Sequence, residues 1–575
     1  MSGTGCAITG VDPFIKPILG PSLVLTLIAL GMTLLVGEAS NLTMFYLERQ
    51  DRWLLSTGTL LLLLAASALR LRRTKPLRGS WKLAVVVGIG MSVFAFAGHY
   101  LVLAGYDMSR DEQMATFDAT IFARGQLFSP LPVFWQDHAD ALNTLFMYPA
   151  DHRGGWVSSY LPLNALMRAG LDVVGSPALA GPLMILVGAV ALWGCARRIW
   201  PEDQEASVVA LLLYFCSGQV LVNGMTSYAM PAHLALNLVW LWLFLRSAWH
   251  TDFAAIIIGF VAVGLHQPLM HPMFAAPLLF LLLIERSWRR AAFYCLGYAL
   301  IGVFWLWWPN LIWALVQADP QTLKPVGVDY LTRLAQALQQ GGFSAPANME
   351  ANLLRFAAWQ PLLLLPLIGL AFPIIRYNRL AAALGGGCVL TIIVMLIILP
   401  YQGHGFGYRY LHGLLGNMFL LGVFGWKEIK TDLARWRGVL VTTSILGFAV
   451  MLPVQLAMAN AFYRPWAIVS RQLDQIRSDY VVIGGGDVPF SQDLVVNPPA
   501  LDRRPVRLIR EAIDQSLITD LCADHPGVAL AGDRLLAPIA RYFDPGDEVS
   551  QAADVANARF ATLLRAAGCR VSWTG

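Results

Sequence analysis

Long apolar runs separated by short polar segments dominate the first 460 residues of the chain. Each run is close to the roughly 20 apolar residues that a helix needs to cross a bilayer. The pattern therefore predicts a polytopic α-helical membrane protein with about thirteen transmembrane helices. The predicted spans lie at 17–36, 53–70, 82–104, 178–196, 206–222, 232–246, 253–266, 272–285, 291–309, 356–375, 380–400, 409–425 and 438–459.

The composition agrees with a membrane protein. The chain is 57% hydrophobic and 13% charged, whereas a soluble domain carries roughly 25% charged residues. The net charge of +5 is distributed among the loops, so we expect no nucleic-acid partner. Lys16 is the only basic residue before the first span, and no clear small-residue cleavage site follows, which favours a retained helix over a signal peptide.

Clusters of basic residues follow the second, fourth, sixth, eighth, tenth and twelfth predicted spans. Because cytoplasmic loops carry an excess of Lys and Arg, the N-terminus is predicted to be cytoplasmic. The loops 105–177 and 310–355 and the C-terminus then lie outside the cytoplasm, as in a multi-pass protein of a bacterial inner membrane. The clusters are Arg70 to Lys82, Arg197 and Arg198, Arg246, Arg286 to Arg290, Arg376 and Arg379, and Lys427 to Arg437.

From about residue 460 the apolar runs shorten to strand length, which predicts a small α/β domain over 461–575 after a transmembrane domain over 1–460. Cys522 and Cys569 lie in this part; a disulfide and two separate buried thiols both remain open. The predicted strands lie at 480–484, 494–496 and 528–530, and the predicted helices at 466–478, 511–523, 534–542 and 552–567. A surface helix is also predicted near 328–340.

The loop 105–177 is long, acidic and aromatic, and long ordered loops are usually functional. Ser109 and Glu112 have the spacing of a capping box, which predicts a helix starting near Arg110. Asp111 and Asp118 then share one face with Ala115 between them, beside an apolar stripe of Met114, Phe117 and Ile121. The helix N-terminus favours ionised Asp111, as suits a base or a cation ligand. Glu112 is equally well explained as a cap or a catalyst. Asp118 could pair with Arg124 or another cation, or it could have a direct role.

Three segments resemble motifs of the GT-C glycosyltransferases, in particular the protein mannosyltransferase and aminoarabinose transferase group. The segment SRDEQMATFDATIFARGQLF is similar to their first periplasmic loop, where Asp-Glu opens a helix. The segment 154–175, with Tyr160, Leu161 and Pro162, occupies the place of their Tyr-Pro-Pro-Leu stretch. The late segment FGYRYLHGLL places Arg409 and Tyr410 where those families have an Arg-Tyr pair.

This resemblance implies transfer of a sugar from a polyprenyl-phosphate donor to an acceptor hydroxyl of a glycan, a lipid or a protein. Asp111 would be the base, and Arg409 would bind the phosphate unless it only snorkels to the interface. The other candidates for the substrate or its phosphate are Tyr410, Tyr160, Asp118, His404, His412, Arg153 and Lys324.

A divalent metal ion is left open. The families' second acidic residue often lies in the next outer loop, but 223–231 contains no carboxylate. Asp151 or Asp137 could substitute for it. Two further candidate ligand sets are His266 with His271, and His138 with Asp137 and Asp140. The glycine-rich segment 484–487 lacks the Lys-Ser/Thr of a phosphate-binding loop and is interpreted as a turn.

Two other functions fit a polytopic protein. The first is a transporter or flippase-like carrier of a lipid-linked or anionic substrate, which would place ionisable residues inside its spans. The second is an assembly subunit that acts through the C-terminal domain. Most charges here lie at span ends, and polar residues gather on one membrane face, which favours an interfacial enzyme.

Overall fold

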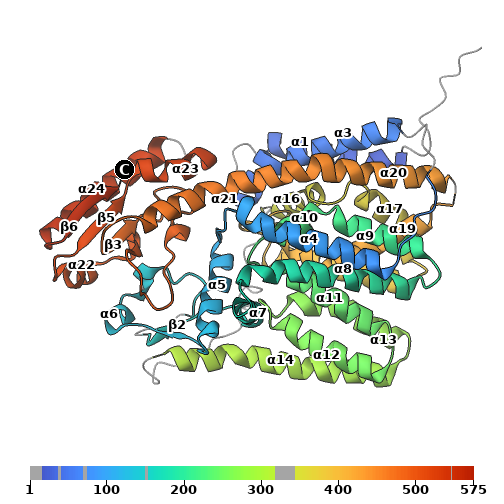
Figure 1. Ribbon diagram of the computed structural model, residues 1–575, viewed down its shortest axis with the longest axis horizontal. Helices are drawn as coiled ribbons and strands as arrows, with labels where there is room; N and C mark the ends of the chain where they lie inside the picture. Colours follow the sequence, from blue (N-terminus) through green and yellow to red (C-terminus); the bar gives the residue numbers. More distant parts are fainter. Residues whose placement is uncertain are drawn as a thin grey trace, which may run out of the picture.

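The structure is a computed structural model that describes residues 16–35, 41–68, 74–148, 153–317, 344–430, 432–544 and 547–574. It is mostly helical, with a helical body and a smaller C-terminal unit that contains a sheet (Figure 1). Lys324, Asp151 and the helix predicted near 328–340 lie outside the described residues.

Helices lie at the predicted hydrophobic spans, although the spans 356–375 and 206–222 are interrupted at residues 359–363 and 216–217. In the described part of the chain, five segments are long and apolar enough to cross a membrane, and six apolar helices are shorter. The five are α4 (Trp81–Leu101), Pro177–Ile199 with α8 (Ala180–Ile199), α14 (Trp288–Val316), α18 (Arg379–Ile398), and Leu433–Asp474 with α20 (Leu433–Leu446) and α21 (Leu452–Asp474). The other helices of the body are α1 (Lys16–Leu35), α2 (Leu42–Tyr46), α3 (Arg52–Ala68), α9 (Gln204–Phe215), α10 (Gly218–Asn223), α11 (Met230–Phe244), α12 (Trp249–Val263), α13 (Met270–Ile284), α16 (Ser344–Ala358), α17 (Leu364–Ile375) and α19 (Leu415–Lys427).

The outer helices turn apolar side chains away from the body. Leu296, Leu300 and Val303 of α14 are exposed, as are Val86 and Val93 of α4. Such a surface is unfavourable in water but is expected where lipid surrounds the helices. Inside the body, close helix packing depends on small residues. A Cβ at Gly425 of α19 would collide with the backbone of α17.

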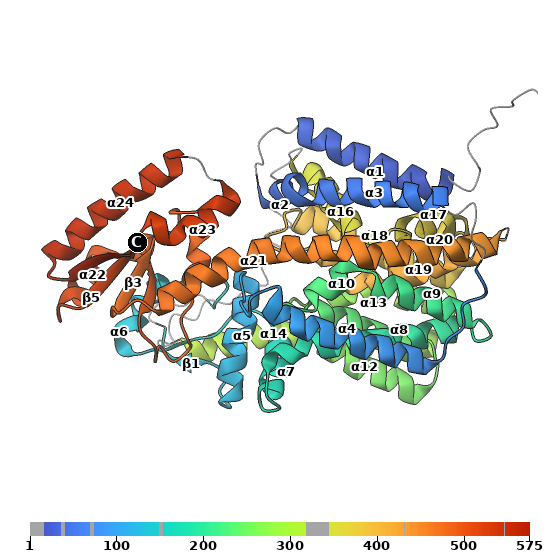
Figure 2. The same ribbon diagram turned by 45° about the horizontal axis from the view of Figure 1, so that its top comes forward.

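A long helix connects the body to the C-terminal unit. Residues Leu433–Asp474 are helical throughout, with a π-helical turn at Gly447–Met451 between α20 and α21. At 1.5 Å per residue this helix is about 63 Å long, about twice the thickness of a bilayer's apolar core. Figures 1 and 2 show α21 extending beyond the body into the C-terminal unit. The predicted domain boundary near residue 460 lies inside this helix.

The C-terminal unit contains a parallel four-stranded sheet in the order β4-β3-β5-β6. Cys522 and Cys569 form a disulfide bond that joins the end of α22 to the start of β6. The strands are β3 (Tyr480–Ile483), β4 (Val506–Ile509), β5 (Gly527–Ala531) and β6 (Arg570–Thr574). The helices are α22 (Gln515–Cys522), α23 (Asp533–Phe543) and α24 (Asp547–Ala566).

The prediction of a strand at 494–496 is wrong. Leu494 ends a short 3-10 helix, and both it and Val495 are completely buried. The apolar run therefore reflects burial and not sheet pairing. Beside it, the Asn497 side chain takes the place of a strand neighbour for β4. It donates to Arg507 O at 2.8 Å and accepts from Arg507 N at 2.9 Å.

The loop 105–177, named the first outer loop below, folds against the C-terminal unit. It contains α5 (Arg110–Ala123), α6 (Val133–Gln136), α7 (Leu163–Asp172) and a short antiparallel pair, β1 (Ser129–Pro130) with β2 (Gly155–Trp156). Both Ser129 Oγ and Trp156 Nε1 donate to Pro499 O at 2.8 Å. Apolar side chains of α5 and of the sheet, among them Phe117 and Leu508, belong to one continuous core. The two segments therefore pack together at one end of the helical body, on the left of Figure 1.

Candidate active site

The predicted capping box is present at the start of α5. Ser109 caps the helix, and Glu112 Oε2 accepts from Ser109 N at 3.2 Å. Glu112 also accepts from Tyr463 OH at 2.9 Å and from Ser227 N at 3.3 Å. Its side chain is fully buried, and burial raises the pKa of this carboxyl. Glu112 thus fixes α5 to α21 and to the segment before α11. It is absent from the residues that line the cavity described below.

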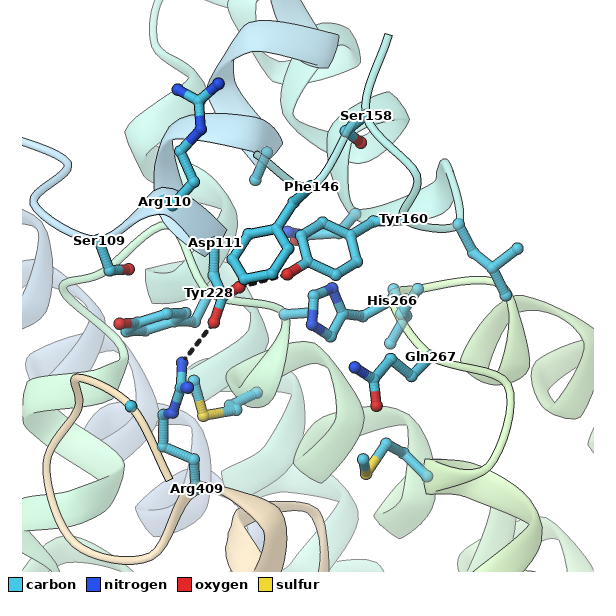
Figure 3. A pocket seen from close by; sticks show the side chains of 18 of the residues that line it. Ser109, Arg110, Asp111, Phe146, Ser158, Tyr160, Tyr228, His266, Gln267 and Arg409 are labelled. Atoms are coloured by element: carbon cyan, nitrogen blue, oxygen red, sulfur yellow. Dashed lines mark hydrogen bonds and ion pairs between the residues drawn. The ribbon is translucent and has the colours of Figure 1, made fainter. Parts of the chain in front are cut away.

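Asp111 points from the first turn of α5 toward Tyr160 and Arg409, as Figure 3 shows. Arg409 Nη1 donates to Asp111 Oδ2 at 2.8 Å, and the Tyr160 hydroxyl donates to Asp111 Oδ1. The Asp111 side chain is 17% exposed. Burial raises the pKa of Asp111, but the Arg409 charge, nearby His266 and the two hydrogen bonds outweigh it, so the pKa lies below its usual value. Asp111 is therefore ionised at neutral pH.

The Arg409 guanidinium lies over the ring of Tyr228, with its Cζ 4.8 Å from the ring centroid. This cation–π contact fixes the plane of the guanidinium. Its Nε is buried and has no hydrogen-bond partner within the described chain. A Cβ at Gly405, whose φ is +140°, would collide with Arg409 Cδ. Arg409 is thus positioned closely, and its guanidinium, which lines the cavity, has more donors than the single one that binds Asp111.

The segment before Arg409 is held by polar side chains from three helices of the body. Thr43 Oγ1 of α2 donates to Gln402 O at 3.2 Å. Arg355 Nη2 of α16 donates to Gly405 O at 2.8 Å, and Gln219 Nε2 of α10 donates to Tyr408 O at 2.9 Å. Because each contact joins distant parts of the sequence, the position of Arg409 depends on the packing of the whole body.

These residues face a cavity of about 680 Å³. One part of its wall is apolar and comes from α13, α14 and the end of α18, with Met270, Trp305, Leu306, Pro309 and Leu399. The other part is polar and carries Asp111, Asp118, Tyr160, His266, His404, Arg409 and Tyr410. Phe490, Gln492 and Asp493 of the C-terminal unit close one side. The cavity can therefore take a molecule with an apolar chain and a polar head.

Asp118 lines the cavity on the same face of α5 as Asp111 and Ala115. The possible pairing with Arg124 is not seen, because Arg124 lies 3.7 Å from Asp502. Asp118 accepts instead from Ser158 N at 3.0 Å and from the Ser158 hydroxyl. Burial raises the pKa of Asp118 to about 7, although both hydrogen bonds oppose the rise.

Two predicted phosphate ligands lie away from the cavity wall. Arg153 Nη2 is 3.4 Å from Asp140 Oδ1 in the first outer loop, and Arg153 does not line the cavity. His412 is fully buried and also outside the lining. His404 and Tyr410 do line it. Arg409, Tyr410 and the preceding His404 thus face the cavity, whereas His412 of the same motif and Arg153 do not.

The predicted metal ligands are separated. His271 hydrogen-bonds to Asn237 and Tyr298 between helices, whereas His266 lines the cavity, its ring centroid 4.0 Å from that of Tyr160. His138 Nε2 is 3.6 Å from Asp520 in the C-terminal unit. Among the residues that the structure describes, no three His, Cys, Asp or Glu side chains form a group suited to a metal ion.

The glycine-rich segment 484–487 is a turn whose amides are already occupied. Gly484 N donates to Asp487 Oδ2 at 2.9 Å, and Gly485 N donates to Glu511 Oε2 at 2.7 Å. Two carboxylates therefore accept the backbone hydrogen bonds that a bound phosphate would otherwise accept.

Sequence reasoning did not identify Arg110, Tyr228, His233 and Asp493 as lining residues. Tyr228 lies in the polar connection 223–231, and this location could have identified it as a lining residue. No sequence feature could have identified Asp493, because its contact with the cavity depends on how the C-terminal unit docks.

The fold is similar to that of a solved structure of ArnT. The structure of ArnT from Cupriavidus metallidurans bound to undecaprenyl phosphate matches with a TM-score of 0.50 and 11% identity, over 86% of this chain and 90% of that chain. The apo structure of the same enzyme matches with a TM-score of 0.45 and 14% identity, over 72% and 84%. No family model and no curated protein matches the chain. ArnT is a GT-C glycosyltransferase, so the predicted resemblance to this fold is confirmed.

Proposed function

We propose that the chain is a membrane glycosyltransferase that moves a sugar from a polyprenyl-phosphate donor to a hydroxyl outside the cytoplasm. The observation that carries this proposal is the Asp111–Arg409 pair, held at 2.8 Å in a cavity with one apolar and one polar part. A polyprenyl chain fits the apolar part, and a sugar phosphate fits the polar part. The ArnT structure contains undecaprenyl phosphate, which agrees with this class of donor.

Arg409 binds the donor phosphate in this mechanism. Its guanidinium lines the cavity and can donate to a phosphate oxygen, and its charge stabilises the phosphate as it leaves. When the phosphate also binds the guanidinium, the ion pair between Arg409 and Asp111 weakens. Asp111 then becomes a stronger base than in the empty site, because the opposing charge that lowers its pKa is partly neutralised.

Asp111 accepts the proton of the acceptor hydroxyl. The hydroxyl oxygen forms a bond to the anomeric carbon from the face opposite the phosphate, and the bond from that carbon to the phosphate oxygen breaks. The electron pair of the broken bond leaves with the phosphate, and the hydroxyl proton moves to Asp111. Attack from the opposite face inverts the anomeric configuration. Tyr160, which donates to Asp111, keeps the carboxylate oriented toward the acceptor.

The other predicted residues have supporting roles in this proposal. Asp118, Tyr410 and His404 line the polar part and bind sugar or phosphate. Glu112, whose contacts are all to the protein, positions the first turn of α5 and does not touch substrate. No step needs a metal ion.

We further propose a multi-pass inner-membrane location with the C-terminal unit on the periplasmic face. The basic loops support this orientation. The length of α20–α21 carries the chain beyond the bilayer core and so places the C-terminal unit outside it. The Cys522–Cys569 disulfide fits an oxidising compartment.

The test uses membrane vesicles from a strain that lacks this protein, because they hold both the unused donor and the acceptor. Purified wild-type protein should transfer the sugar, as measured by mass spectrometry of the envelope glycans, lipids and proteins. Asp111→Asn should lower the rate by about 10²- to 10⁴-fold, the usual contribution of a positioned base. The exposed Asp524→Asn serves as the control. Unchanged transfer by Asp111→Asn would refute the base assignment.

A second measurement separates binding from chemistry. Arg409→Ala should weaken the binding of undecaprenyl phosphate in lipid nanodiscs, whereas Asp111→Asn should leave it intact or strengthen it. Equal affinity of Arg409→Ala and wild type would show that Arg409 does not bind the phosphate.

A further inference from the structure

A second acidic side chain reaches the cavity from the C-terminal unit. Asp493 lies in the short 3-10 helix Ser491–Leu494 and lines the cavity beside Gln492. The backbone of this segment is bound to the first outer loop. Gln113 Nε2 donates to Asp493 O at 2.8 Å, and Asn143 Nδ2 donates to Gln492 O at 2.8 Å. These contacts fix the Asp493 backbone beside α5.

The Asp493 carboxylate faces His404 across a gap. Asp493 Oδ2 is 4.0 Å from His404 Nε2, which is too far for a hydrogen bond. His404 is only 7% exposed, and its Nε2 has no hydrogen-bond partner in the described part of the chain. An unpaired buried nitrogen is costly, so this gap is suited to a polar group from outside the protein.

The geometry of the gap selects the kind of group. One oxygen atom placed about 2.8 Å from both atoms would hydrogen-bond to each of them. His404 Nδ1 already contacts Tyr46 OH at 2.8 Å, so Nε2 is the ring nitrogen left for a ligand. A hydroxyl can accept from Nε2–H and donate to the carboxylate at once. A phosphate oxygen cannot donate, and an ammonium group cannot accept.

The charges around the gap agree with a neutral ligand. Arg110 and Asp111 of α5 influence Asp493, and their signs are opposite. His404 is influenced by Arg409, Asp111 and Arg355, and the two arginines are paired with Asp111 and Asp51. Arg110 Nε donates to Leu145 O at 3.1 Å, and its other donors also bind uncharged oxygens. Burial raises the pKa of Asp493 to about 7; Arg110 opposes this rise and Asp111 adds to it.

We propose that Asp493 and His404 form a subsite that binds one hydroxyl group of a sugar ring, so that the C-terminal unit supplies a specificity-determining side chain to the transfer site. This inference rests on the proposed glycosyl transfer. The hydroxyl belongs either to the donor sugar or to an acceptor glycan, and both sources present the same chemistry to the subsite.

Two assays with full-length protein test this subsite. The first follows transfer in vesicles from the strain that lacks the protein. The second follows release of free sugar from a lipid extract of that strain, where water replaces the acceptor. Asp493→Ala should lower transfer by about 10- to 100-fold, the loss expected for a hydrogen bond to a charged group. Asp493→Asn, which keeps a hydrogen-bonding oxygen, should recover part of it. Asp524→Ala, exposed in the same unit, is the matched control.

The results identify the source of the hydroxyl. If Asp493→Ala lowers sugar release as much as transfer, the subsite binds the donor sugar. If it lowers transfer alone, the subsite binds the acceptor. An unfolding temperature equal to that of the wild type shows that Asp493→Ala is folded. If Asp493→Ala does not fold, transfer and sugar release are compared with Asp493→Asn instead. Normal transfer by the folded Asp493 variants would refute the subsite while leaving the proposed function intact. Wild-type protein that consumes no lipid-linked sugar would refute both.

Discussion

The buried ion pair of Asp51 and Arg355 tests how the segment before Arg409 is held. Arg355 Nε donates to Asp51 Oδ2 at 2.9 Å, and each side chain is 1% exposed. Trp359 Nε1 donates to the other Asp51 oxygen at 2.7 Å. Arg355 Nη2 donates to Gly405 O at 2.8 Å. One buried cation thus joins the helical body to the segment that carries Arg409.

The perturbation is Asp51→Asn, which keeps the shape of the side chain and removes its charge. Arg355 is then left buried without its counter-charge, at a cost of about 3–5 kcal/mol. The expected result is a clearly lower unfolding temperature in detergent, followed by intrinsic tryptophan fluorescence. Transfer in vesicles from the strain that lacks the protein should also fall, because Arg355 no longer fixes Gly405.

A double variant separates stability from positioning. Asp51→Asn with Arg355→Met removes both charges, and replacing a buried pair by apolar groups is often neutral for stability. The double variant should therefore unfold near the wild-type temperature but stay impaired in transfer, since the donor to Gly405 O is absent. Full recovery of transfer would refute the role of Arg355 in positioning. An unchanged unfolding temperature of Asp51→Asn would refute the expected loss of stability from an unpaired Arg355.

Three further predictions concern the site. Glu112→Gln should lower the unfolding temperature while a folded sample keeps most of its kcat, because Glu112 only caps and anchors α5; loss of kcat without loss of stability would contradict this. Gly405→Ala should lower transfer and undecaprenyl phosphate binding together, because its Cβ collides with Arg409 Cδ at a φ of +140°; wild-type binding would contradict it. Transfer should rise as pH increases through about 7, where both Asp493 and Asp118 lose their protons, and the step should be smaller in Asp493→Asn, which keeps only the contribution of Asp118; identical pH profiles of the two proteins would contradict the assignment.

The sequence was sufficient where the determining signal was local. Ser109 and Glu112 are three residues apart, and their capping box fixed the start of α5, as the structure confirms. The start of α5 in turn placed Asp111 and Asp118 on one face, which lines the cavity. Hydrophobic length likewise placed the helices of the body, because each apolar run depends on its own residues.

Local sequence patterns could not predict the contacts between distant segments. Asp111 and Arg409 are 298 positions apart, and only the order of weak motifs linked them. The pairing of Asp118 with Ser158, and not with Arg124, depends on how the outer loop turns back on α5. Asp493 carries no local signal, because its place in the cavity follows from the docking of the C-terminal unit.

Short apolar runs were ambiguous for a physical reason. Leu494 and Val495 are as buried as the residues of a central strand, yet they pack in the main core without a ladder. The pattern records burial, and burial alone does not distinguish a strand from a buried turn.

The central claim is that Asp111 removes the proton of an acceptor during transfer from a polyprenyl-phosphate sugar. The most direct measurement is mass spectrometry of lipids from cells whose only copy of the protein is wild type, Asp111→Asn or Asp524→Asn. The account predicts that a sugar-bearing polyprenyl phosphate accumulates with Asp111→Asn and not with the other two, at equal amounts of folded protein. Equal levels of that lipid in all three strains would contradict it.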